Sequence, residues 1–185
     1  MPLQHASGPM LKAMKRGVTR AGQERILTRV REFVPDIAIR STFIVGFPGE
    51  TEADFQELAS FIGDQQFARV GVFTYFQEDG TPAATMDDQV ADEVKVARQA
   101  HLMTLQAGIS KARHEALLGQ ALPVMVDGVS EESELLLSGR LESQAPDVDG
   151  QVFITSAPKG IQPGDILPCR ITQASEYDLV GELIS

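Results

Sequence analysis

The chain has 185 residues, of which 43% are hydrophobic and 23% charged, as is typical of a globular protein with one domain or two small ones. The one cysteine, Cys169, excludes an internal disulfide framework, and we expect a buried small hydrophobic side chain and a cytoplasmic protein. No apolar run approaches the length of a membrane span.

The net charge of −10 is unevenly spread. Residues 1–117 contain 13 Lys and Arg against 15 Asp and Glu, whereas residues 118–185 contain 3 against 11. Such an acidic segment repels a phosphate backbone, so its charge argues against direct RNA binding. It suits a basic partner, but acidic residues also promote solubility, and charge alone leaves both interpretations open.

The first 117 residues predict alternating helices and strands. Ser7 or Gly8 is expected to cap a short helix with Pro9 at its first position, and Gly17 to end it. After it we expect a helix from Thr19 that stops before Pro35, a strand over 37–45, a helix over 52–62, a strand over 68–76, a polar loop over 77–88 and a long helix over 90–118. This order favours a parallel sheet with covering helices.

The stretch IRSTFIVGFPGET, residues 39–51, is the most informative one. A buried-strand pattern runs into Gly46, Pro48 and Gly49, and Thr51 then reads as a helix N-cap with Asp54 three residues on. Ligands of parallel α/β folds bind at such carboxyl ends of strands. An ordinary strand–helix turn without a ligand is the alternative.

After Gly119 the pattern changes to short strands. They are expected over 122–126, 134–141, 151–155, 165–171 and 177–184, separated by the turn pairs Asp127-Gly128, Asp149-Gly150 and Pro163-Gly164. Five short strands in so short a segment suit a small barrel or sandwich. We therefore place the domain boundary near residues 118–120.

Several stretches together resemble one enzyme family. In chain order these stretches are PLQHASGPMLKAMKR, RSTFIVGFPGETEADF, RVGVFTYFQEDGTPAA and DGVSEESELLLSGRLESQAPDVDG. They resemble, in the same order, stretches of the radical S-adenosylmethionine (radical SAM) methylthiotransferases. The resemblance is to the RimO-type branch, which methylthiolates an aspartate of ribosomal protein twelve of the small subunit. Residues 144–150, QAPDVDG, carry the most branch-specific part of it.

This resemblance implies a fold, cofactors and a partner. The fold is an α/β partial TIM-like (radical SAM) barrel over 1–117, followed by a small all-β five-stranded TRAM (OB-like) barrel over 118–185. The family uses S-adenosylmethionine and two [4Fe-4S] clusters, whose cysteine ligands this chain lacks. We therefore expect the carboxy-terminal part of an enzyme, inactive alone, monomeric when full length, away from membranes, and meeting a basic ribosomal protein through its acidic TRAM domain.

The resemblance also assigns candidate residues for binding S-adenosylmethionine, and none for catalysis or metal binding. They are Gln4, Arg40, Thr42, Ile44, Phe73 and Tyr75. Each assignment has a structural alternative: a solvated turn for Gln4, an ion pair inside the barrel for Arg40, and core packing for the aromatic rings. For His5 a bond to the cofactor or the substrate is the alternative to the structural role that we expect, and Glu50 is expected to brace backbone N–H groups.

Two further segments carry open interpretations. Lys15 and Arg16 end the first helix and are expected to serve its dipole more than a ligand. Residues 144–150 either meet the ribosomal protein or form a simple turn through Asp147 and Asp149. Two other functions also remain: methylthiolation of tRNA adenosine, and a non-catalytic acidic module that binds a basic protein.

Overall fold

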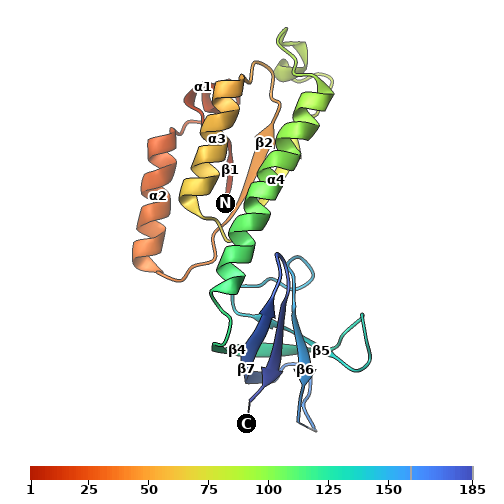
Figure 1. The fold of residues 1–185 in the computed structure, drawn as a ribbon. Helices are drawn as coiled ribbons and strands as arrows, with labels where there is room; N and C mark the ends of the chain where they lie inside the picture. Colours follow the sequence, from red (N-terminus) through yellow and green to blue (C-terminus); the bar gives the residue numbers. More distant parts are fainter. Residues whose placement is uncertain (159, 185) are drawn as a thin grey trace. The chain divides into compact units, whose positions relative to one another are not determined.

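The computed structural model describes residues 1–158 and 160–184 (Figure 1). The chain divides into two compact units, Met1–Ile109 and Ser110–Ser185, and each is described by itself. This division falls inside the helix α4 (Asp92–Glu115), so the domain bounds 1–117 and 118–185 stay a prediction. No helix among the described residues is long and apolar enough to cross a membrane.

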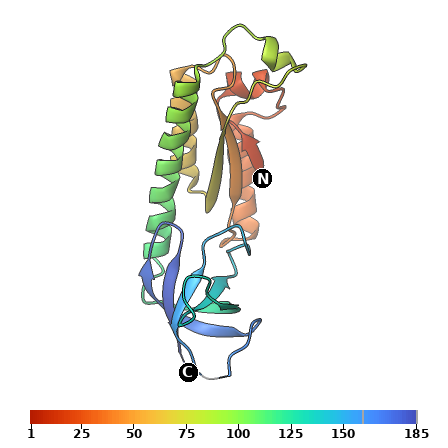
Figure 2. The ribbon, with the colours of Figure 1, turned by 90° about the vertical axis from the view of Figure 1, so that its right-hand side faces the viewer.

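The first unit is built on a parallel sheet with strand order β1 (Pro2–Gln4), β2 (Arg40–Val45) and β3 (Arg69–Thr74). The helices are α1 (Gly8–Ala13), α2 (Arg20–Phe33), α3 (Glu52–Gln65), α4 and the 3₁₀ turn η1 (Pro82–Thr85). Figure 2 shows α3 and α4 on one side of this sheet. The predicted parallel sheet is therefore confirmed, but a barrel is not: this unit shows three strands and their helices.

The core of the first unit lies between the sheet and the helices. Ser41, Phe43 and Val45 of β2 are buried, whereas the alternate residues of that strand are half-buried. The Phe43 ring makes edge contacts with Phe61 and Phe67, with centroids 6.3 and 5.8 Å apart. Strand alternation thus gives the sheet one face packed on helices and one more open face.

The boundaries of several elements differ from prediction for local reasons. The predicted strand over 37–45 begins only at Arg40, because parallel pairing with β3 starts there, and the helix predicted over 52–62 continues to Gln65. The loop predicted over 77–88 contains η1, whose start is capped by the Thr81 hydroxyl. These differences leave the order of elements unchanged.

The second unit is a closed barrel with strand order β4-β5-β6-β8-β7. Its strands are β4 (Ala121–Val129), β5 (Leu137–Leu141), β6 (Val152–Ser156), β7 (Ile166–Ala174) and β8 (Leu179–Leu183). All five predicted strands exist, and the choice between barrel and sandwich is settled, because β7 pairs with β4 and closes the sheet. Val124, Val152, Ile154 and Leu179 lie in its core.

One predicted strand of this unit starts late. The strand expected over 134–141 begins at Leu137, because the preceding residues form a turn in which Ser130 N–H donates to the Leu136 carbonyl. Cys169 is fully buried in the barrel core, as predicted. Burial, with a smaller contribution from nearby Glu182, raises the pKa of its thiol to about 11.

Candidate functional site

Glu50 organises the carboxyl end of the parallel sheet in the first unit. Its Oε1 lies 3.1 Å from His5 Nε2, and its Oε2 accepts from the backbone N–H of Gly46 and from Arg98 Nη1, the latter at 2.9 Å. The side chains of His5 and Glu50 are fully buried. The carboxylate therefore joins the end of β1, the turn after β2 and helix α4, and the predicted bracing role of Glu50 is confirmed.

The geometry fixes the tautomer of His5. The backbone N–H of Ser7 donates to His5 Nδ1 at 3.0 Å, so the proton of a neutral ring is on Nε2 and is donated to Glu50. His5 thus has the structural role expected for it. Sequence reasoning missed Arg98, although Arg98 stands four residues before the fully buried Leu102 and so lies on the buried face of α4.

A second polar cluster holds the start of α3. Thr51 and Asp54 form a capping box, with Thr51 N–H donating to Asp54 Oδ2 at 3.0 Å and Asp54 N–H to Thr51 Oγ at 3.2 Å. The Ser7 hydroxyl donates to Asp54 Oδ1. Burial acts to raise the pKa of Asp54, but the hydrogen bonds from Ser7 and Thr51 outweigh it and hold this pKa below its ordinary value.

The turn after β2 leaves no room for a side chain at Gly46. Gly46 has φ +74°, and a Cβ placed there would lie 2.2 Å from Lys95 Cγ. Lys95 is itself buried, with its Nζ 2.9 Å from Asp92 Oδ1 and 5.7 Å from the centroid of the Tyr75 ring. The turn is therefore held rigidly between the Glu50 carboxylate and the start of α4.

Four of the six predicted cofactor residues share the open face of the sheet. Arg40, Thr42 and Ile44 alternate with the buried residues of β2, and Ile44 pairs in register with Phe73, whose side chain is 58% exposed. The sheet thus brings a guanidinium, a hydroxyl and an aromatic ring to one face. Gln4 ends β1 with φ +70°, a conformation that is rare for a residue other than glycine and is often found at functional sites.

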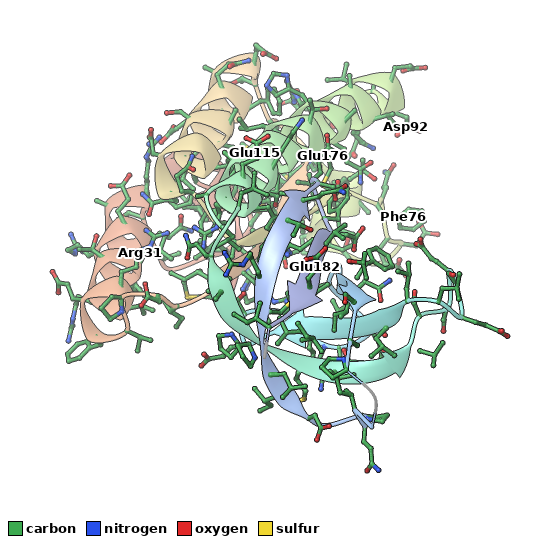
Figure 3. All side chains as sticks on the ribbon, turned by 60° about the horizontal axis from the view of Figure 1, so that its bottom comes forward. Arg31, Phe76, Asp92, Glu115, Glu176 and Glu182 are labelled. Carbon is green, nitrogen blue, oxygen red and sulfur yellow. The ribbon has the colours of Figure 1, made fainter. Side chains whose placement is uncertain are left out.

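The two predicted aromatic residues lie in different surroundings. The Tyr75 ring packs edge-on against Phe47, with centroids 5.2 Å apart, and lies under Lys95. The Tyr75 hydroxyl is buried without a hydrogen-bond partner among the described residues. Phe76, the next residue, is 77% exposed and labelled in Figure 3. Because Phe73 is 58% exposed, its ring is available for stacking. Tyr75 instead offers a buried hydroxyl without a hydrogen-bond partner among the described residues, at the end of the strand.

These residues fit S-adenosylmethionine but not an iron–sulfur cluster. An open sheet face with an exposed ring, polar groups and an orphaned hydroxyl suits a nucleoside with charged substituents. The thiol of Cys169 is buried in the barrel core, and the described residues contain no group of three His, Cys, Asp or Glu side chains that could hold a metal. A cluster therefore finds no ligand set within the described part of the chain.

The branch-specific stretch, residues 144–150, forms a closed loop between β5 and β6. Gln144 is buried, accepting from Leu141 N–H at 2.8 Å and donating to the Gly150 carbonyl at 2.7 Å. Asp149 accepts from Ala145 N–H at 2.8 Å, so its carboxylate serves the turn. Pro146, Asp147 and Val148 are exposed, and Asp147, with φ +60°, is the exposed carboxylate among them that a basic partner could reach.

Comparison with known proteins relates residues 118–184 to one domain family and the whole chain to one enzyme family. The family model described as TRAM domain matches residues 118–184. Curated relatives named ribosomal protein uS12 methylthiotransferase RimO align over the full chain: 51% identity for Geobacter sulfurreducens, 50% for Trichlorobacter lovleyi and 49% for Syntrophotalea carbinolica. These alignments cover 100% of this chain but 41%, 40% and 40% of the respective relatives, so the chain spans about two fifths of their length. With its TRAM domain and this identity along its whole length, the chain belongs to the RimO-type methylthiotransferase family, of which it represents the carboxy-terminal part.

Proposed function

We propose that this chain supplies the carboxy-terminal part of an enzyme that methylthiolates the β-carbon of an aspartate in ribosomal protein uS12 by radical SAM chemistry. The observation that carries the proposal is the identity of about half, over the entire chain, with relatives named for that reaction. The three-stranded sheet is then part of a TIM-like barrel, and the enzyme works as a monomer in the cytoplasm, where its substrate is made.

The first unit has the role of seating S-adenosylmethionine. When bound, this cofactor supplies the radical that removes hydrogen from an unactivated carbon. Arg40 and Thr42 offer polar contacts on the open sheet face, Ile44 and Phe73 offer apolar ones, and Gln4 and Tyr75 offer an amide and a hydroxyl at the strand ends. Glu50, with His5 and Arg98, acts as a positioning group, because it holds the turn that borders this face.

The second unit has the role of meeting the protein substrate. Residues 118–185 carry 11 acidic against 3 basic residues, which attracts a basic protein and speeds its encounter. Three of these carboxylates, Glu131, Glu132 and Glu134, are exposed in the turn between β4 and β5, beside the 91% exposed Leu135. Asp147 adds a charge on the neighbouring loop.

Two other functions are less well supported. A tRNA-adenosine methylthiotransferase needs an RNA-binding surface, and the acidity of residues 118–185 argues against one on the second unit. A non-catalytic acidic module that binds a basic protein needs only the second unit. It gives no role to the buried ion network at the end of the sheet or to the open face beside it.

The decisive experiment is mass spectrometry of uS12 from cells with and without the gene that encodes this chain. We expect the mass of one methylthio group on an aspartate only when the gene is intact. If uS12 is unmodified in both strains and a tRNA adenosine loses its methylthio group instead, the substrate is tRNA. No change in either molecule would favour the binding module.

A further inference from the structure

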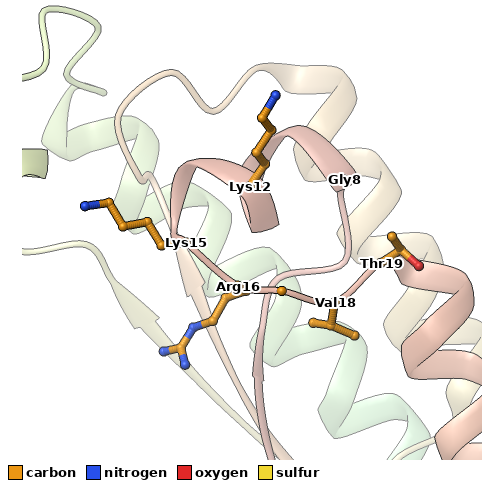
Figure 4. A pocket seen from close by; sticks show the side chains of 7 residues that line it. Gly8, Lys12, Lys15, Arg16, Val18 and Thr19 are labelled. Carbon is orange, nitrogen blue, oxygen red and sulfur yellow. The ribbon is translucent and has the colours of Figure 1, made fainter.

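We propose that the corner between α1 and α2 binds phosphate groups of an RNA backbone. The corner contains a pocket of about 500 Å³ lined by Gly8, Lys12, Lys15, Arg16, Gly17, Val18 and Thr19. Figure 4 shows Lys15 and Arg16 extending to the same side of this corner, with Lys12 rising from α1. Three of the seven lining residues are therefore cations.

The charge of this corner is opposite to that of the rest of the chain. The net charge of the chain is −10, yet its first 23 residues contain Lys12, Lys15, Arg16 and Arg20 and no Asp or Glu. The net negative charge of the chain repels RNA at long range. An RNA strand can bind only where a local excess of positive charge outweighs this repulsion. The corner provides that location in the first unit.

Arg20 provides an internal comparison for the three cations of the pocket. Its guanidinium contacts Glu24 at 2.9 Å, Asp64 at 3.1 Å and Glu57 at 3.8 Å, so acidic residues of the chain neutralise it. Within the part of the chain that the structure describes, Lys12, Lys15 and Arg16 have no ion pair or side-chain hydrogen bond with a protein group. Their charge is thus available to an external anion, although 26 acidic residues exist in the chain.

Two local features make positively charged side chains energetically unfavourable at this corner. Lys15 has φ +55°, which favours glycine or asparagine, and yet carries a long charged side chain. The corner also lies at the positive end of the α2 dipole, and the first turn of that helix contains no acidic residue. A bound phosphate would relieve both the mutual repulsion of the cations and their repulsion from the helix end.

The exposure of the three cations favours a polymer over an enclosed small molecule. Lys12, Lys15 and Arg16 are all exposed, so they can contact successive phosphates of a strand that crosses the corner. The choice of RNA rests on the proposed function, because a ribosomal protein substrate is assembled with RNA. The binding test below is independent of methylthio transfer, so the failure of either proposal can be recognised separately.

The test measures binding of a fluorescent single-stranded RNA oligonucleotide to the whole chain at several salt concentrations. We expect Lys12→Gln/Lys15→Gln/Arg16→Gln to weaken binding about tenfold or more, and the slope of log affinity against log salt to fall by about two, as for three lost phosphate contacts. The matched control is Arg25→Gln/Arg29→Gln/Lys111→Gln, which removes the same charge from exposed positions elsewhere. We expect little change there.

Three results would overturn the proposal. Equal weakening by the two triple variants would mean that only the total charge matters. Displacement of the RNA by polyglutamate at equal charge concentration would mean that the corner does not prefer phosphate. Displacement by inorganic phosphate at equal phosphate concentration would mean a site for a single free phosphate and not for an RNA strand. Circular dichroism of both variants excludes unfolding as the cause.

Discussion

His5 and Glu50, 45 residues apart in sequence, meet through a 3.1 Å contact between Nε2 and Oε1 with both side chains fully buried. The same carboxylate also receives the Gly46 N–H and the Arg98 guanidinium. A buried carboxylate with three donors is stable only as a complete set, since the loss of one charged partner leaves the other uncompensated. The end of the sheet therefore depends on this set.

Replacing Glu50 by Gln should destabilise the first unit strongly. The change leaves the buried Arg98 without its charged partner, and we expect a loss of about 3–5 kcal/mol in the free energy of unfolding. Chemical denaturation with a probe in the first unit measures it. The matched control is Glu52→Gln, because Glu52 also contacts Arg98 but is 68% exposed to solvent, and this change should cost far less stability than Glu50→Gln. Equal losses would contradict the assigned role.

Replacing Gly46 by Ala should disturb the turn after β2. The new Cβ would lie 2.2 Å from Lys95 Cγ in a backbone with φ +74°, and we expect a cost of about 2–4 kcal/mol from overpacking and strain together. Gly49→Ala is the control, because Gly49 has φ +82° but open space around it. The control should lose about 1 kcal/mol. If the two variants have the same melting temperature, the contact with Lys95 does not contribute to the cost of Gly46→Ala.

Replacing Asp54 by Asn should cost about 1 kcal/mol near neutral pH, as for the loss of a helix cap. Because the pKa of Asp54 is held below its ordinary value of 3.8, its carboxylate stabilises the fold fully above that pH. This contribution disappears as the pH falls through the lower folded pKa. Urea denaturation of both proteins from pH 6 down to pH 2 should show converging stabilities. A gap that stays constant would assign the effect to packing alone.

The Cys169 thiol should stay unreactive in the folded protein. Burial, as the main cause, and the nearby Glu182 carboxylate, as a smaller one, raise its pKa from 9.0 to about 11. The nucleophilic thiolate is therefore scarce at neutral pH. Because the unfolded thiol ionises at a lower pH, the free energy of unfolding should fall as pH rises from 9 to about 11. A thiol reagent and pH-dependent denaturation measure these effects. Cys169→Ala should remove the thiol's part of this pH dependence, and rapid labelling of the native chain would contradict its burial.

Neutralising the turn between β4 and β5 should weaken binding of a basic protein. We expect Glu131→Gln/Glu132→Gln/Glu134→Gln to reduce the affinity for uS12 several-fold at low salt, with a smaller difference at high salt. Surface plasmon resonance with the whole chain measures this. Asp36→Asn/Asp79→Asn/Asp87→Asn changes the charge equally at exposed positions of the first unit. If this control weakens binding as much, the acidic turn is not the contact surface.

The sequence by itself determined the order of elements and the family. The helix that follows Thr51, the turn at Gly46–Gly49 and the five strands after Gly119 were all predictable, since apolar spacing, N-caps and turn residues act over a few neighbouring positions. The placement of Arg40, Thr42 and Ile44 on one face also followed from strand alternation. That these residues bind a cofactor stays a prediction.

Only the tertiary structure decided which polar groups meet. Arg98 and Glu50 are 48 residues apart, and no local pattern pairs a helix residue with a turn that far away. The same holds for Arg20, which finds Glu57 and Asp64 on α3, whereas its neighbours Lys15 and Arg16 remain exposed at a pocket. Partners of buried and surface charges depend on how helices pack on the sheet, and packing is a property of the whole unit.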